Sequence, residues 1–129
     1  MSWRSPLARV RGYGSAKEGV GHWWSQRLSS VALIPLGVWL LVSLLALPRL
    51  DHVTVSAWLS AGLTPLLLIL FVLVAAWHSQ LGLRVIVEDY VHEEGLKTLT
   101  LTLLAFAHVL LAGAATLAVL RIALGAAPA

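Results

Sequence analysis

A histidine lies inside one of the most apolar stretches of this chain. His78 comes directly after residues 63–77, which contain almost no polar side chains. An ionisable group at membrane depth is costly and usually marks a functional site with a definable partner. A neutral imidazole is also a good axial ligand for haem iron. His78 is therefore the first candidate metal ligand in this sequence.

The same apolar stretch ends in three polar residues, Glu88, Asp89 and Tyr90. At about 100° per residue, Asp89 lies close to the helix face of His78 and about 16 Å farther along the axis. Gly82 lies one turn from His78 and has no side chain, so a flat cofactor can approach the backbone there. One helix is thus expected to carry a candidate metal ligand and, near the water boundary, a candidate proton-handling cluster.

A second polar group stands where the first apolar stretch begins. Residues 21–27 read Gly-His-Trp-Trp-Ser-Gln-Arg. Trp23 and Trp24 are typical anchors at a membrane interface. Arg27 either pairs with an anion, such as a haem propionate or a polar quinone headgroup, or extends to lipid phosphate. His22 lies beside this group near water, as expected of an interfacial residue.

His108 is the main rival of His78 as a ligand. It lies within the last apolar stretch at a depth similar to that of His78. One chain can in principle hold a haem between His78 and His108, or His108 bonds only to a helix carbonyl. The spacing of the two residues leaves both alternatives open.

Composition restricts the class of protein. The chain has 129 residues, of which 59% are hydrophobic and 12% are charged, with a mean hydropathy of +0.86. These values fit a small integral membrane protein and not an ordinary soluble domain. The absence of cysteine excludes thiolate-ligated iron–sulfur clusters and disulfides within this chain. The net charge of +3 comes from basic residues spread over an arm and short loops, so we expect membrane topology and no nucleic-acid partner.

Three apolar spans are expected, at residues 28–47, 57–87 and 96–124. Each is long enough for the roughly 20 residues that cross a hydrocarbon core of ~30 Å. The turn between the first two spans contains a proline, and the turn between the last two contains a glycine. We therefore predict an all-α integral membrane protein, with an N-terminal arm over residues 1–27 and a three-helix transmembrane domain over residues 28–125.

The orientation follows from the positions of lysine and arginine. Most of the nine basic residues lie in the N-terminal arm or beside the second turn, and the opposite side holds only Arg49 and Arg121. Because cytoplasmic loops carry the excess of lysine and arginine, the N-terminus is expected in the cytoplasm. Asp89 and Tyr90 then lie at the cytoplasmic edge.

These motifs resemble a known family. The segment at residues 21–27 enters the first span, His78 and Gly82 lie in the second, and Glu-Asp-Tyr-Val ends it at residues 88–91. This pattern closely resembles the hydrophobic membrane-anchor subunit of succinate dehydrogenase (complex II), the small cytochrome b subunit, in its alphaproteobacterial form. The resemblance covers the length, the three spans, the orientation and both motifs. It implies a multi-pass protein of the bacterial inner membrane.

The resemblance also implies roles for individual residues. The histidine that matches His78 is an axial ligand of haem b, which the chain shares with a second anchor subunit. The tyrosine that matches Tyr90 hydrogen-bonds the quinone, expected to be ubiquinone, and the aspartate that matches Asp89 belongs to the same proton-linked site. Arg27, with His22 beside it, is expected near the haem propionates.

The implied function divides the work among several subunits. A flavoprotein subunit oxidises succinate, and an iron–sulfur subunit passes the electrons to the membrane. This chain and a second cytochrome b anchor subunit hold the quinone, and no succinate chemistry is expected in this chain. The alternatives are a stand-alone cytochrome b that uses both His78 and His108, a purely structural anchor, and a small transporter subunit. Menaquinone as the quinone and fumarate reduction as the direction remain alternatives as well.

Overall fold

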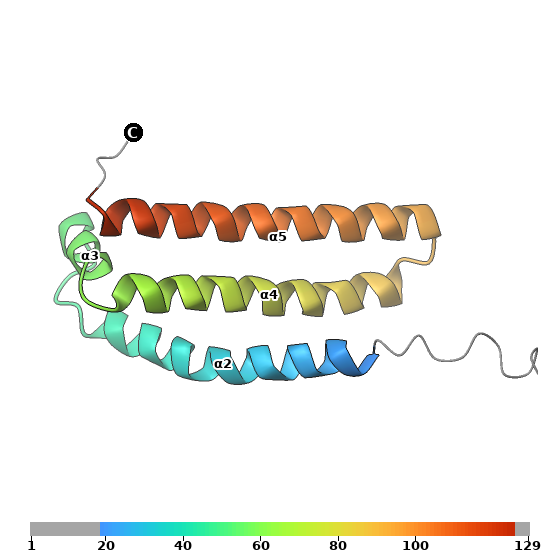
Figure 1. Ribbon diagram of the computed structural model, residues 1–129, viewed down its shortest axis with the longest axis horizontal. Coiled ribbons are helices and arrows are strands. Elements are labelled where there is room, and N and C mark those ends of the chain that lie inside the picture. Colours follow the sequence, from blue (N-terminus) through green and yellow to red (C-terminus); the bar gives the residue numbers. More distant parts are fainter. Residues whose placement is uncertain (1–18, 126–129) are drawn as a thin grey trace, which may run out of the picture.

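The computed structural model describes residues 19–125, and this part of the chain is helical (Figure 1). Its elements are α2 (Gly19–Leu45), α3 (His52–Leu59), α4 (Thr64–Tyr90) and α5 (Glu94–Ala123). The long helix α4 lies between α2 and α5 and packs on both of them. The short helix α3 contacts α5 and α4 at one end of the bundle. Both other long helices therefore pack on α4 and position its side chains.

The three long helices are each long and apolar enough to cross a membrane. They have 27, 27 and 30 residues, and at ~1.5 Å per residue each exceeds a hydrocarbon core of ~30 Å. Very few of the described side chains are buried, namely Ser29, Leu59, Leu81 and Val119. A helix that is apolar on all sides faces lipid or further protein. The expectation of an all-α membrane protein with three spans is confirmed.

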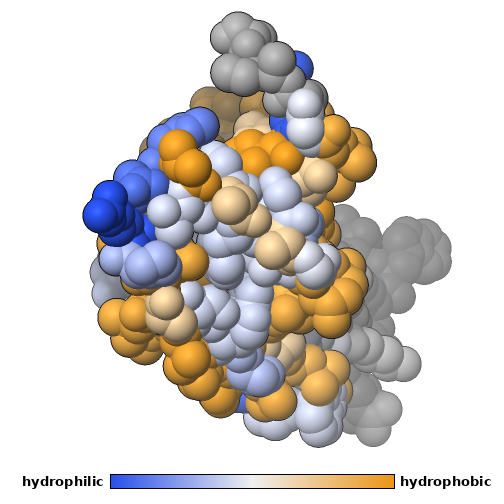
Figure 2. All heavy atoms as spheres, turned by 90° about the vertical axis from the view of Figure 1, so that its left-hand side faces the viewer, coloured by the Kyte–Doolittle hydropathy of each residue, from blue (hydrophilic) through white to orange (hydrophobic). Residues whose placement is uncertain are grey.

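The two ends of the bundle differ in what they carry. The start of α2, the end of α4 and the start of α5 lie together at one end, which we call the Tyr90 end (Figure 1). Figure 2 views the bundle from the opposite end, at α3, where hydrophobic side chains border the view and a hydrophilic patch lies at one edge. The first residues of α2, from Gly19, therefore lie at the Tyr90 end.

The helix boundaries differ from the expected apolar spans at two places. Helix α2 begins at Gly19, well ahead of residue 28, so the polar group at residues 21–27 is helical. The expected second span over residues 57–87 is divided into α3 and α4. Gly62 adopts a φ of +50° between them, a conformation that favours glycine. Pro65 follows in the first turn of α4, where a missing N–H costs nothing.

Carboxylates cap two of the helices. Asp51 accepts a hydrogen bond from the backbone N–H of Thr54 at 2.8 Å and begins α3. Glu93 accepts hydrogen bonds from the N–H groups of Leu96 and Gly95 and begins α5. These backbone donors favour the charged form and lower the pKa of both carboxyl groups. The caps fix where each helix starts outside the membrane.

Candidate functional site

His78 lies on α4 and faces α2. Its Nδ1 is 2.9 Å from Ser29 Oγ, and its Nε2 is 3.4 Å from Gln26 Nε2. The ring is half-buried between the two helices. Both nitrogens of His78 therefore meet polar side chains of α2.

Ser29 is the one buried polar residue among residues 19–125, with 7% of its surface exposed. Its hydroxyl lies 2.8 Å from the carbonyl oxygen of Ser25 and 3.1 Å from that of Gln26. A serine within a helix commonly donates to a carbonyl one turn back. Ser29 thus connects the backbone of α2 to the imidazole on α4.

Gly82 keeps the α4 backbone accessible beside His78. A Cβ built on Gly82 meets only the side-chain nitrogen of Gln26 within 4 Å, at 3.7 Å. The side-chain oxygen of Gln26 is buried and has no hydrogen-bond partner among the described residues. The side chain of Gln26 is therefore the group that lies against both His78 Nε2 and Gly82.

Asp89 and Tyr90 are the last residues of α4. Both are exposed, and 79% of the surface of Tyr90 is accessible. The backbone carbonyl of Tyr90 accepts a hydrogen bond from His92 Nδ1 at 3.1 Å. The carboxylate and the phenol therefore stand at the Tyr90 end, about three helical turns from His78, where a second molecule can reach them.

Arg27 does not contact His78. Its guanidinium carbon lies 5.6 Å above the ring of Trp23, a distance typical of a cation–π interaction. Because Gln26 and Ser29 face His78, the neighbouring Arg27 is turned away by about 100° from Gln26. Arg27 is exposed and forms no ion pair with another of residues 19–125, so an anion can reach it.

His22 lines a pocket between α2 and α4. This pocket was not predicted from the sequence. The pocket has a volume of about 620 Å³ between α2 and α4, and its lining includes Trp77 and Leu81. Arg84 and Glu88 also line it and form an ion pair of 2.7 Å. Within residues 19–125, the Nε2 atom of His22 is buried without a hydrogen-bond partner. The spacing of Arg84 and Glu88, four residues apart on one helix, was a signal for this pair.

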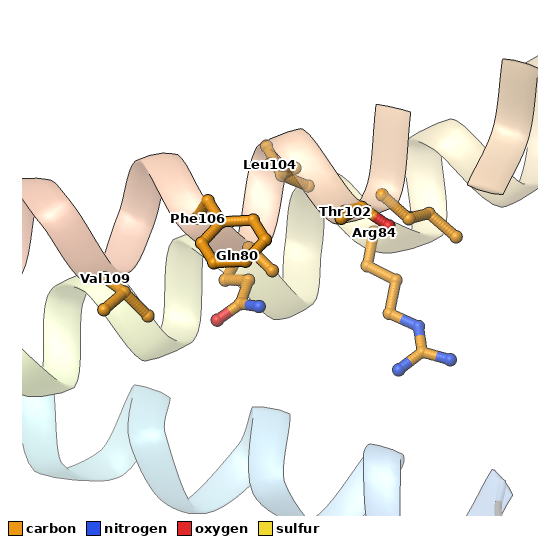
Figure 3. Close-up of a pocket in the computed structure, with 8 residues that line it drawn as sticks. Gln80, Arg84, Thr102, Leu104, Phe106 and Val109 are labelled. Atoms are coloured by element: carbon orange, nitrogen blue, oxygen red, sulfur yellow. The ribbon is translucent and has the colours of Figure 1, made fainter. Parts of the chain in front are cut away.

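Figure 3 shows a second pocket, between α4 and α5, of about 480 Å³. Its lining is mostly apolar and includes Leu104, Phe106 and Val109. Thr102, on α5, donates its hydroxyl to the carbonyl of Thr98 at 2.8 Å, so its polar group is already used. This pocket does not include His78 or Tyr90.

His108 is bound within the chain. Its Nδ1 lies 2.8 Å from the carbonyl oxygen of Leu104, and its Nε2 lies 3.3 Å from Ser79 Oγ. It therefore faces α4 from α5, whereas His78 faces α2. The two histidines occupy different helix interfaces, and this geometry gives no support to a haem held between them.

Within residues 19–125, no group of three or more histidine, aspartate or glutamate side chains is placed to hold a metal ion.

The comparisons with known proteins place the chain in a family. The family described as succinate dehydrogenase/fumarate reductase transmembrane subunit matches residues 1–118. The chain belongs to this family. A succinate dehydrogenase hydrophobic membrane anchor subunit of Rickettsia bellii is 32% identical over 90 residues, covering 69% of this chain and 71% of the relative. The subunit of the same description from Paracoccus denitrificans is 29% identical over 126 residues, covering 98% and 97%.

A third relative, the succinate dehydrogenase membrane anchor subunit of Reclinomonas americana, is 30% identical over 91 residues, with 68% of this chain and 76% of the relative covered. The comparison with solved structures found no match. The expected alphaproteobacterial type of membrane anchor is confirmed. The chain is a membrane anchor subunit of succinate dehydrogenase and a multi-pass protein of the bacterial inner membrane.

Proposed function

We propose that this anchor subunit holds haem b through His78 and contributes Tyr90 and Asp89 to a quinone-reduction site. The observation that carries the proposal is the setting of His78. Its ring is half-buried in a membrane helix, it is oriented by two side chains of α2, and it stands one turn from Gly82. An ionisable residue held this way inside an apolar span is typical of a ligand site.

His78 would supply one axial ligand of the iron. When bound, the haem supplies a one-electron redox centre within the membrane. We propose that the second ligand comes from a second anchor subunit, because His108 already bonds to Leu104 and Ser79. Gly82 leaves room for the edge of a flat ring, and Gln26 has only to rotate away.

Arg27 and His22 would contact the propionates. Arg27 is an exposed cation at the start of the apolar part of α2, and a carboxylate would neutralise it there. The described part of the chain offers no hydrogen-bond partner to the buried Nε2 of His22, and such an atom is costly to bury unless another group bonds to it. Arg27 lies at the level of His78, between Gln26 and Ser29 in the sequence, and His22 lies about one turn closer to the Tyr90 end.

Tyr90 and Asp89 would serve the quinone, which we propose is ubiquinone. The Tyr90 hydroxyl can donate a hydrogen bond to a quinone carbonyl and polarise it for reduction. The Asp89 carboxylate can pass protons from the water phase to the reduced quinone. With the N-terminus in the cytoplasm, as the basic residues favour, this end faces the side where an iron–sulfur subunit and a flavoprotein subunit would deliver electrons.

The experiment compares His78→Ala with His108→Ala in the assembled complex. We expect His78→Ala to remove or shift the low-spin b-type spectrum, because the iron loses an axial ligand. His108→Ala is the matched control, a membrane histidine whose contacts stay within the chain, and it should leave the spectrum unchanged. If His78→Ala keeps a wild-type spectrum and His108→Ala loses it, the ligand assignment is wrong. If neither changes it, neither of these two histidines is a haem ligand.

A further inference from the structure

We propose that Ser29 is a positioning residue that sets the tautomer of His78. Ser29 holds the ring proton on Nδ1 and leaves the lone pair of Nε2 for iron, and its hydrogen bond lowers the reduction potential of the haem. This inference rests on the proposed function of His78 as an axial ligand. It adds a residue on α2 that controls the ligand without touching the cofactor.

The first argument is the proton count at Ser29. A serine hydroxyl has one proton to donate and can accept through its oxygen. The carbonyl oxygens of Ser25 and Gln26, at 2.8 and 3.1 Å from Ser29 Oγ, are acceptors only. With the hydroxyl proton directed to them, Ser29 Oγ can only accept from the ring nitrogen 2.9 Å away. His78 Nδ1 therefore carries the proton.

The second argument comes from the other ring nitrogen. An amide nitrogen donates hydrogen bonds and does not accept them, and that of Gln26 lies 3.4 Å from His78 Nε2. The favourable partner for such a donor is an unprotonated ring nitrogen. With the Gln26 amide in this orientation, the contacts at the two nitrogens lead to the same tautomer, in which Nε2 holds the free lone pair.

The two partners of His78 differ in how firmly they are held. Ser29 has a short side chain, is 7% exposed and is bonded to its own backbone one turn back. Gln26 is joined to the ring only by the longer contact of 3.4 Å and can leave when iron arrives. Ser29 therefore keeps its hydrogen bond in the bound state, where a donor bond from Nδ1–H increases the basicity of the ligand. A more basic ligand stabilises ferric iron and lowers the potential.

Ser79 supplies a matched control on the same helix as His78. Its hydroxyl lies 3.3 Å from Nε2 of His108, so it also bonds a membrane histidine from a neighbouring helix. If any lost serine–histidine bond between helices disturbed the haem, Ser79→Ala would do so as well. A change confined to Ser29 variants points to the ligand itself.

The test measures haem content, midpoint potential and the low-spin electron paramagnetic resonance signal of the purified complex. For Ser29→Ala we expect a raised potential, a shifted signal and haem affinity lower by about 10-fold or more. Ser29→Thr keeps the hydroxyl and should restore the wild-type potential, and Ser79→Ala should match wild type. If Ser29→Ala does not assemble, Ser29→Cys retains the side-chain volume with a weaker acceptor, and it should raise the potential in the same direction.

The result that overturns the inference is a haem-loaded Ser29→Ala or Ser29→Cys complex with the potential and signal of wild type. An equal shift in Ser79→Ala would also overturn it. The variant His78→Ala distinguishes failure of the proposed function from failure of this inference about Ser29. If that variant retains the wild-type haem spectrum, His78 is not the ligand, whatever Ser29 does.

Discussion

The substitution Tyr90→Phe tests the quinone site with a minimal change to the chain. It deletes one hydroxyl and keeps the ring of the last residue of α4. Because Tyr90 is 79% exposed and its contact with His92 uses the backbone carbonyl, helix packing should not change. A lost hydrogen bond to the quinone should cost about 1–3 kcal/mol in the transition state, or roughly 5- to 150-fold in the rate of quinone reduction.

The assay measures two activities on the same assembled preparation. Quinone reduction should fall, whereas succinate oxidation with a soluble acceptor that bypasses the membrane should stay nearly constant. Tyr13→Phe, the same chemical change at the other tyrosine of the chain, is the control. Equal loss of both activities in Tyr90→Phe would indicate general damage to the complex. No loss of either would remove Tyr90 from the site.

Three further predictions concern the ends and turns of the helices. Arg27→Leu removes the cation proposed to contact a haem propionate. In the assembled complex, haem retention should weaken or the reduction potential of the haem should shift. Wild-type values of both would mean that Arg27 only anchors the helix to lipid. The N–H of Leu96 lowers the pKa of Glu93 below its usual 4.5, so the stabilisation of α5 by this cap is complete above pH 4.5 and is lost as the pH falls through the lowered pKa. Amide exchange at the start of α5 should show this acid-dependent fraying, and Glu93→Gln should abolish its pH dependence. Gly62→Ala forces a side chain to a φ of +50° and should destabilise the chain by about 1–2 kcal/mol in thermal unfolding. The control is Gly113→Ala, which has open space around it inside α5 and should be neutral or stabilising. Equal effects of the two substitutions would refute the role of the turn at Gly62.

The break between α3 and α4 could have been predicted more fully from the sequence. Gly62 and Pro65 are strong local signals for a turn and a new helix start. Hydropathy alone does not reveal this turn, because the residues on both sides of Gly62 and Pro65 are apolar. The start of α2 at Gly19 was missed for the opposite reason, since an interfacial helical turn carries polar residues and ends the apolar pattern early.

Part of the candidate site could also be predicted, because it lies on one helix. The spacing of His78, Gly82, Asp89 and Tyr90 along α4 follows from helix geometry alone. Ser29 and Gln26 could not be paired with His78 in this way. Their polar side chains are visible in the sequence, but no periodic pattern indicates which helix they face.

The sequence by itself determined the class of protein, the three membrane spans and the order of groups along α4. This is because a bilayer requires about 20 apolar residues per span and satisfies the backbone only within helices. Only the tertiary structure decided which side chains meet across helices. It placed Ser29 against His78, Ser79 against His108, and Arg27 on the ring of Trp23. Helices that are apolar all round have no single face that their sequence assigns to a neighbour, so the rotation of α2 and α5 against α4 comes from packing and from these few polar contacts.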